Sequence, residues 1–308
     1  MLRRGGRHTP NWVAGLAGIR TEPSAYAWND LMVDGLVKSS TFKDLQNALG
    51  SELESDLLIP RFLSMVEKYF GEFKDHILPS LAPTSIHLYM PEDSTVYFDF
   101  KCLFDFLKKT YGYTVTLNDP RTYVDDPAGI HIRDSIEDLF FDDPIRRAHD
   151  LITHIRQQDS FILNPTSSVV GDQKSLLPYL KDRLPIINCH HLNKFTEKTL
   201  LSEFKKSKED LVLKPSQGYG GYGIMIGRNS TQSDWDCAIN RISSEDLNYI
   251  VQRYHQPDTH VDFWNHTLKA NFNFWIFGGE FAGAFARTSS SEPINYHQGG
   301  ALLPVVYF

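Results

Sequence analysis

The stretch LVLKPSQGYGGYGIMIG, residues 211–227, places four glycines within six residues, between two apolar runs. Glycine weakens a strand, because it loses more backbone freedom on folding than other residues and has no side chain to pack. The runs on either side have the composition of strands. The stretch therefore predicts a β-hairpin with a mobile glycine loop, defined here as residues 218–223, whose backbone N–H groups approach phosphate oxygens. A tight structural hairpin is the alternative interpretation.

Three of these glycines, Gly218, Gly220 and Gly223, have the G-x-G-x-x-G spacing of several nucleotide-binding folds. A dinucleotide-binding fold requires a helix after the glycines, whereas Ile-Met-Ile-Gly follows here and is typical of a strand. A Walker loop requires a Lys-Ser or Lys-Thr pair, and a protein kinase requires H-R-D and D-F-G elements; the sequence has none of these. A dinucleotide oxidoreductase is therefore only a third hypothesis, which rests on the glycine spacing.

Composition limits the class of protein. The 308 residues, 41% hydrophobic and 22% charged, are enough for one large core or two moderate ones, so we expect two lobes. The net charge of -7 gives no overall attraction for nucleic acid or an anionic membrane. The three cysteines form no C-x-x-C pair, which argues against a disulfide scaffold or a cysteine zinc site. No apolar run is long enough to cross a bilayer, so we expect a soluble, cytoplasmic protein.

The chain divides into three regions by pattern. Residues 1–84 are expected to be mainly helical, with an aromatic stripe in 59–78 that belongs to a core. Residues 85–165 alternate between strand-like and helix-like segments, which predicts a small parallel α/β lobe. Residues 166–308 are rich in strand-like segments separated by glycine turns, with one helical segment at 234–243, and predict an α+β region with antiparallel strands. The middle lobe is expected to contain strands at 85–90, 113–119 and 160–164 and helices at 98–112 and 143–158.

Several motifs occur in a defined order: Asp-Pro-Arg at 119–121, LNPTSSVVGDQKSLLPYL at 163–180, the Lys-Pro pair before the glycine loop, YIVQRY at 249–254 and ARTSSSEPINYHQGG at 286–300. In this order the chain, from about Ser85 to Phe308, resembles the ATP-grasp superfamily. It is similar in particular to the circularly permuted branch that includes glutathionylspermidine-synthase-like ligases. The resemblance implies an ATP-grasp fold with a preceding parallel α/β lobe, ATP and Mg²⁺ as cofactors, and the joining of a carboxylate to an amine.

The resemblance also implies a nucleotide site. Lys174 would reach a phosphate or the adenine edge, and Lys214 the α- and β-phosphates, where an anion would compensate a lysine placed in an apolar strand. Gln252 would contact adenine, since an amide is both donor and acceptor. The other expected nucleotide contacts are Gly218, Tyr219, Gly220, Gly221 and Gly223, with Tyr222 flanking the nucleotide. A solvated lysine at 174 and a polar strand residue at 252 are the structural alternatives.

Two further residues match positions that act on the transferring group in the family. Arg287 would stabilise charge on the phosphoryl group and the acyl phosphate, and a salt-bridged strand arginine is the alternative. Asn295 matches the asparagine of a closing N-x-x-x-G-G segment, in which Gly299 and Gly300 bring backbone amides to the same region. These two residues are the predicted catalytic residues.

The magnesium ligands are where the sequence departs from the family. The expected Asp and Glu-x-Asn would lie on two strands within residues 24–47, joined at Val-Asp-Gly, yet no Glu-x-Asn follows. Asp30 is the candidate ligand, and Asp34, Glu52 and Glu292 are possible substitutes. Lys269 also stands where relatives have an arginine.

Two hypotheses come before the dinucleotide oxidoreductase. One is an active ligase with small carboxylate and amine substrates, such as amino acids or a peptide or protein end. The other is a nucleotide-binding protein without catalytic activity, which has a degenerate ATP-grasp fold that lacks the metal carboxylates.

Overall fold

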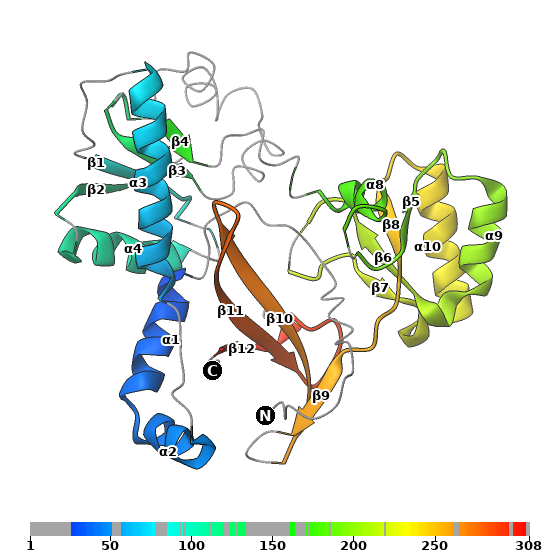
Figure 1. Ribbon diagram of the computed structural model, residues 1–308. Helices are drawn as coiled ribbons and strands as arrows, with labels where there is room; N and C mark the ends of the chain where they lie inside the picture. The colour runs from blue at the N-terminus through cyan, green and yellow to red at the C-terminus, as the bar shows by residue number, and fades with distance from the viewer. Residues whose placement is uncertain are drawn as a thin grey trace. The chain divides into compact units, whose positions relative to one another are not determined.

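The structure is a computed structural model (Figure 1). The predicted helix at 143–158, Glu52 and Tyr219 lie outside the residues that it describes. The described residues are 26–50, 57–77, 85–92, 94, 97–110, 112–119, 124–126, 128–133, 161–163, 171, 173–184, 186–218, 220–261, 265–295 and 298–305.

The described residues form two compact units. The glycine-loop unit comprises those of 172–271 and 288–301. The parallel-sheet unit comprises those of 20–171, 272–287 and 302–308. The domain boundaries predicted after residues 84 and 165 stay predictions.

A four-stranded parallel sheet forms the centre of the parallel-sheet unit (Figure 1). Its strand order is β2-β1-β3-β4, and α4 connects the first two strands. The parallel pairing of these strands confirms the parallel α/β lobe expected in this region. Parallel neighbours need a crossover connection, and α4 supplies it between β1 and β2. The elements are β1 (Ser85–Tyr89), α4 (Tyr97–Thr110), β2 (Thr114–Asn118), β3 (Ile130–Arg133) and β4 (Phe161–Leu163).

Helix α3 (Leu58–Ile77) supplies the aromatic side of this core. Phe62, Val66 and Phe70 are buried against the apolar side chains of β1, β3 and α4, as the aromatic stripe predicted. The Phe62 ring also meets Phe277 edge to face at 5.7 Å. Such ring pairs stabilise a core beyond the area that they bury.

Residues 26–47 are helical, so the expectation of two metal-bearing strands joined at Val-Asp-Gly is wrong. Helix α1 (Tyr26–Lys38) continues through Asp34 and Gly35, and α2 (Ser40–Leu49) follows. The Ser39 hydroxyl accepts a hydrogen bond from Phe42 N and starts α2. The Ser39 cap favours a helix here, and this local signal outweighs the Val-Asp-Gly turn motif. The expectation that the N-terminal region is mainly helical agrees with these helices.

The remaining strands confirm the expected antiparallel arrangement. In the glycine-loop unit, the strand order is β5-β8-β6-β7. Helices α9 and α10 cover one face of this sheet (Figure 1), and Trp235 of α10 is fully buried there. Another sheet has the order β12-β11-β10-β9. The elements are α8 (Leu177–Leu180), β5 (Cys189–Leu192), α9 (Lys198–Lys206), β6 (Leu211–Pro215), β7 (Met225–Ile226), α10 (Gln232–Ser244), β8 (Tyr249–Arg253), β9 (Asp258–Val261), β10 (Thr267–Phe277), β11 (Glu280–Ser289) and β12 (Ala301–Pro304).

The fold is therefore mixed, with a parallel α/β sheet and antiparallel sheets, as predicted. Within the described ranges, no helix combines the length and the apolar character that crossing a bilayer requires.

Candidate functional site

Lys214 and Gln252 lie on the face of the β5-β8-β6-β7 sheet opposite α9 and α10. In the register Val212 pairs with Gln252 and Lys214 with Ile250, so the side chains of Lys214 and Gln252 share one face. Lys214 Nζ donates a hydrogen bond to Gln252 Oε1 at 2.5 Å. Gln252 is 2% exposed, and its Nε2 has no hydrogen-bond partner among the described residues. The structure brings these two predicted nucleotide residues together and leaves a buried donor available beside them.

The electrostatic surroundings of Lys214 are unusual for a lysine. Burial in the first place, and the nearby Lys174 ammonium in the second, lower the pKa of its ammonium from an ordinary 10.5 to about 8. In the described part of the chain, no carboxylate forms an ion pair with Lys214. Two neighbouring cations, one of them half-buried, would be stabilised by a bound anion.

Lys174 connects this face to the glycine loop. It begins a short 3₁₀ turn (Lys174–Leu176), and its backbone N–H donates to Ser216 O at 2.9 Å. Its Nζ donates to Gly218 O at 2.6 Å. The structure therefore places Lys174 at the start of the loop, where its charge also acts on Lys214.

The loop has the backbone conformation that its glycines permit. Gly218, Gly220, Gly221 and Gly223 all have positive φ, a region that other residues rarely adopt. A Cβ at Gly223 would lie 2.8 Å from Pro215 Cγ. Strands β6 and β7 on either side of the loop are antiparallel, which confirms the predicted hairpin. Tyr222 is 62% exposed.

The predicted closing segment contacts the loop within the same unit. Gln298 Nε2 donates to Gly220 O at 3.3 Å, and a Cβ at Gly221 would lie 3.2 Å from Pro293 Cγ. Asn295 O accepts hydrogen bonds from the backbone N–H groups of Gln298 and Gly300. The glycine loop and the Asn295 segment, far apart in sequence, are therefore neighbours.

A buried carboxylate lies at the beginning of this segment. The side chain of Glu292 is 5% exposed, and its Oε1 accepts from Lys269 Nζ at 2.5 Å and from Tyr254 OH at 2.9 Å. Its Oε2 is buried without a hydrogen-bond partner in the described ranges. Burial, with Glu292 as a further cause, raises the pKa of Tyr254. The lysine that replaces the expected arginine thus neutralises a glutamate.

Arg287 belongs to the other unit. It is on β11 in the parallel-sheet unit, and its guanidinium lies 5.3 Å from the centre of the Phe285 ring. Its predicted catalytic role, like that of Asn295, stays a prediction.

The described residues do not fit a magnesium site. Both carboxylate oxygens of Asp30 accept backbone hydrogen bonds at the start of α3, from Leu58 N at 2.6 Å and Ile59 N at 2.8 Å. Asp34 pairs with Lys38 on the surface of α1. The described ranges hold no group of three acidic, histidine or cysteine side chains placed to bind a metal. The magnesium assignment of Asp30 stays a prediction. In the structure this carboxylate caps the N-terminus of α3.

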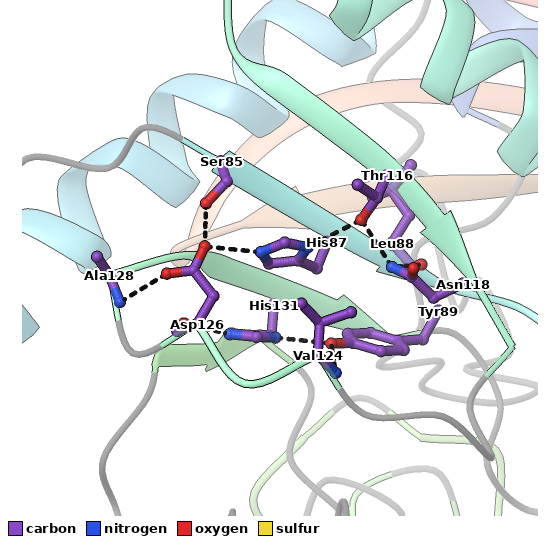
Figure 2. Close-up of polar contacts among 10 residues, drawn as sticks. All are labelled: Ser85, His87, Leu88, Tyr89, Thr116, Asn118, Val124, Asp126, Ala128 and His131. Carbon is purple, nitrogen blue, oxygen red and sulfur yellow. Dashed lines mark hydrogen bonds and ion pairs between the residues drawn. The ribbon is translucent and has the colours of Figure 1, made fainter.

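A buried polar network in the parallel sheet was missed by the sequence interpretation (Figure 2). Asp126 Oδ2 accepts a hydrogen bond from Ser85 Oγ and lies 2.9 Å from His87 Nε2. Burial alone would raise the pKa of Asp126, but the contacts with Ser85 and His87 lower it. The other ring nitrogen of His87 lies 2.8 Å from Thr116 Oγ1. Because Ser85 is bonded to the carboxylate rather than to the imidazole, this is not an activated serine nucleophile.

The network continues along the same face. Tyr89 OH lies 2.9 Å from His131 Nδ1, and His131 Nε2 lies 2.9 Å from Asp126 O (Figure 2). The signal for this network is the alternation of polar and apolar residues in SIHLY and IHIR, since strands buried on both faces of a parallel sheet are usually apolar throughout.

Comparison with known proteins gives limited similarity. No family model matches the chain. An uncharacterized protein from Mycobacterium leprae (strain TN) is 24% identical over 197 residues, which cover 54% of this chain and 34% of that protein. The chain thus spans about a third of the length of the curated relative that it matches.

Similar solved structures include two synthetases and an ATP-grasp protein. D-cycloserine synthetase DcsG has a TM-score of 0.45 and 17% identity, with 72% of each chain covered. D-alanyl-alanine synthetase A from Vibrio cholerae has a TM-score of 0.45 and 11% identity, covering 73% of this chain and 74% of that one. The RimK domain protein ATP-grasp from Sphaerobacter thermophilus has a TM-score of 0.42 and 11% identity, covering 72% and 90%. At TM-scores below 0.5, these similarities do not establish a function.

Proposed function

We propose that the chain is an ATP-dependent ligase of the ATP-grasp type that joins a carboxylate to an amine. The observation that carries the proposal is the environment of Lys214. A half-buried ammonium with a lowered pKa lies beside a second cation, and no carboxylate in the described ranges neutralises it. A triphosphate supplies the negative charge that this arrangement requires.

The neighbouring groups fit the rest of a nucleotide. The buried Nε2 of Gln252 has a hydrogen available for an acceptor on the adenine edge. The loop glycines allow backbone N–H groups to approach phosphate oxygens without a Cβ in the way. The loop contacts the Asn295 segment, so closing it over ATP would exclude water from a reactive intermediate.

The proposed reaction has two steps. A carboxylate oxygen of the first substrate attacks the γ-phosphorus of ATP, which forms an acyl phosphate and releases ADP. The nitrogen of the second substrate then attacks the acyl carbon, which forms an amide and releases phosphate as the nitrogen loses a proton. Arg287 and Asn295 are proposed, from the family resemblance, to stabilise the transferring phosphoryl group. Amino acids or peptide ends are the proposed substrates.

A nucleotide-binding protein without catalysis is the second candidate. The lack of an acidic cluster in the described ranges favours it, because ATP-grasp chemistry uses magnesium held by carboxylates. In this candidate the lysines and the loop retain ATP, and no group is transferred.

Thermal unfolding of the purified chain distinguishes the candidates. A ligand that binds only the native state raises the melting temperature. A rise with ATP that requires Mg²⁺, together with ADP release when amino acids are added, supports the ligase. A rise with ATP that does not depend on Mg²⁺, without ADP release, supports the second candidate. No rise with ATP, or an equal rise with NAD, contradicts both.

A further inference from the structure

The closing segment, defined here as the described residues of 290–300, connects β11 to β12 and belongs to neither strand. It is part of the glycine-loop unit. Pro293 packs against Gly221 of the loop, and Gln298 Nε2 donates to Gly220 O. Because the segment lies outside the strand ladders, the side chains that attach it determine how firmly it holds the loop.

Glu292 attaches the beginning of the closing segment. Its side chain is 5% exposed, and its Oε1 accepts hydrogen bonds from Lys269 Nζ at 2.5 Å and from Tyr254 OH at 2.9 Å. Lys269 belongs to β10 and Tyr254 follows β8, so residues of two different strand regions hold one carboxylate oxygen. Glu292 also precedes Pro293, the residue in contact with Gly221. A displacement of Glu292 would therefore be passed directly to the loop.

Tyr254 is itself fixed from two further directions. Its backbone N–H donates to Asp210 O at 2.7 Å, directly before β6. The guanidinium of Arg228, which follows β7, lies 3.8 Å from the centre of the Tyr254 ring. Arg228 Nε in turn donates to Glu209 O at 3.1 Å. Tyr254 is thus held by the residues before β6 and after β7, the two strands that flank the glycine loop, and its hydroxyl reaches Glu292 from this frame.

The contact between Tyr254 and Glu292 is a hydrogen bond to a charged acceptor. Burial first, and the hydrogen bond to Glu292 second, raise the pKa of Tyr254, so its hydroxyl remains a donor at neutral pH. Hydrogen bonds to a carboxylate are stronger than those between neutral groups, and the Lys269 ammonium adds an ion pair at the same oxygen. Such an anchor restrains a glycine loop, whose own backbone is conformationally permissive.

We propose that Tyr254 and Glu292 are positioning residues for the glycine loop: they hold the closing segment on the sheet, and the segment holds the loop. They act through Pro293 and Gln298. A loop that is held in place before a ligand arrives loses less conformational freedom on binding, which raises affinity for the group that the loop contacts. The order of the free loop does not depend on the proposed ligase, whereas the consequence for ATP rests on it.

Nitrogen-15 relaxation of the full chain, labelled in glycine, measures the order of the loop backbone on the picosecond to nanosecond timescale. In the wild type we expect order parameters near about 0.85 for Gly220 and Gly221, and values of about 0.6 or lower in the variants that lose the anchor. Gly278 and Gly279, in the turn between β10 and β11 of the other unit, are the internal reference. Their order parameters should not change.

Two variants remove the anchor in different ways. Tyr254→Phe removes one hydroxyl and keeps the ring that Arg228 contacts. Glu292→Gln keeps the size of the side chain and removes its charge. Tyr113→Phe and Glu67→Gln are the matched controls, because they alter a hydrogen bond of the same kind, from Tyr113 OH to Glu67 Oε1 at 2.7 Å, in the parallel-sheet unit. Neither control should change the order of the loop.

A comparison of ATP with adenosine shows whether the anchor positions the loop for phosphates. The loop is proposed to contact the phosphates, and Gln252 the adenine. In each anchor variant we therefore expect ATP affinity to fall about tenfold in isothermal titration, while adenosine affinity stays that of the wild type. A residue that only stabilises the fold would change both affinities alike.

The outcomes separate the positioning roles from the proposed ligase. Unchanged loop order in either folded variant overturns the proposal, as does a wild-type loop already at about 0.6 or lower. An equal decrease at Gly278 and Gly279 also overturns it, because this would report general loosening. In a chain that binds ATP, an ATP affinity that is unchanged, or that falls together with adenosine affinity, contradicts the proposal as well. A wild type that does not bind ATP contradicts the proposed ligase, and the order parameters then decide the positioning roles alone.

Discussion

Two sheets of this chain carry polar side chains on a buried face, and they differ in whether the hydrogen bonding is complete. In the parallel sheet, Ser85, His87 and His131 are bonded to Asp126 or Thr116 through the network of Figure 2. In the sheet of the glycine-loop unit, Gln252 Nε2 and His191 Nε2 have no partner within the described residues. A complete network holds a fold together, whereas an incomplete one leaves hydrogen bonds for a ligand to make.

Charge follows the same division. In the parallel sheet the Asp126 carboxylate faces His87, so charge and partner lie together. On the other sheet the Lys214 ammonium has an amide oxygen and a second cation as neighbours. The first arrangement is stable without a ligand, and the second is improved by an anion.

Lys214→Met is expected to have the largest effect, on ATP binding. Removing one partner from a desolvated charge pair costs about 2–5 kcal/mol, so we expect ATP affinity to fall by about 1,000-fold, near 4 kcal/mol. Isothermal titration measures it. The matched control is Lys205→Met, which removes a half-buried lysine of the same unit whose ammonium bonds only to Asn240 Oδ1 among the contacts described. Equal ATP affinity of wild type and Lys214→Met would contradict the interpretation that the Lys214 face binds an anion.

The pH dependence of stability is the second test. Since the folded chain holds Lys214 at a pKa of about 8 and the unfolded chain near 10.5, only the unfolded chain binds this proton between these values. The wild type should therefore gain stability relative to Lys214→Met as pH rises from 8 to 10.5, by up to about 3 kcal/mol. Urea unfolding of both proteins across this range measures the difference. A constant difference would show that Lys214 is not held at a lowered pKa.

His87→Leu tests the complete network. The change leaves Thr116 Oγ1 and Asp126 Oδ2 with fewer partners in a partly buried site, so we expect a loss of about 2 kcal/mol in the free energy of unfolding. The size of the ATP-induced rise in melting temperature should not change, because no ligand is needed to complete this network. His255→Leu, at an exposed histidine, is the control. If His87→Leu instead keeps the stability of the wild type and no longer binds ATP, the parallel sheet and not the Lys214 face carries the ligand site.

Local patterns predicted part of this fold from the sequence. The glycine hairpin and the aromatic helix α3 could be predicted because a few adjacent residues determine them. The prediction that Lys214 and Gln252 belong to one nucleotide site came from the family resemblance, which rests on the order of the motifs. The contact of His87 with Asp126 joins residues 39 apart, and no local pattern specifies it. Helix α9 was missed because its nine residues lie in a strand-rich context, where a short amphipathic segment is a weak signal.

Asp30 is where the family resemblance and the described structure disagree most, and its test has the smallest expected effect. Asp30→Ala removes the acceptor for Leu58 N and Ile59 N at the start of α3. Burial raises the pKa of Asp30 in spite of these bonds, so the cost of holding a carboxylate there offsets part of what the cap contributes. We expect a loss of about 1 kcal/mol in urea unfolding, and none for Asp34→Ala at the exposed pair with Lys38. If Asp30 instead binds magnesium, as the resemblance implies, its removal would abolish any Mg²⁺ dependence of the ATP-induced rise in melting temperature. If Asp30 only caps α3, the Mg²⁺ dependence of the ATP-induced rise in melting temperature is unchanged in Asp30→Ala.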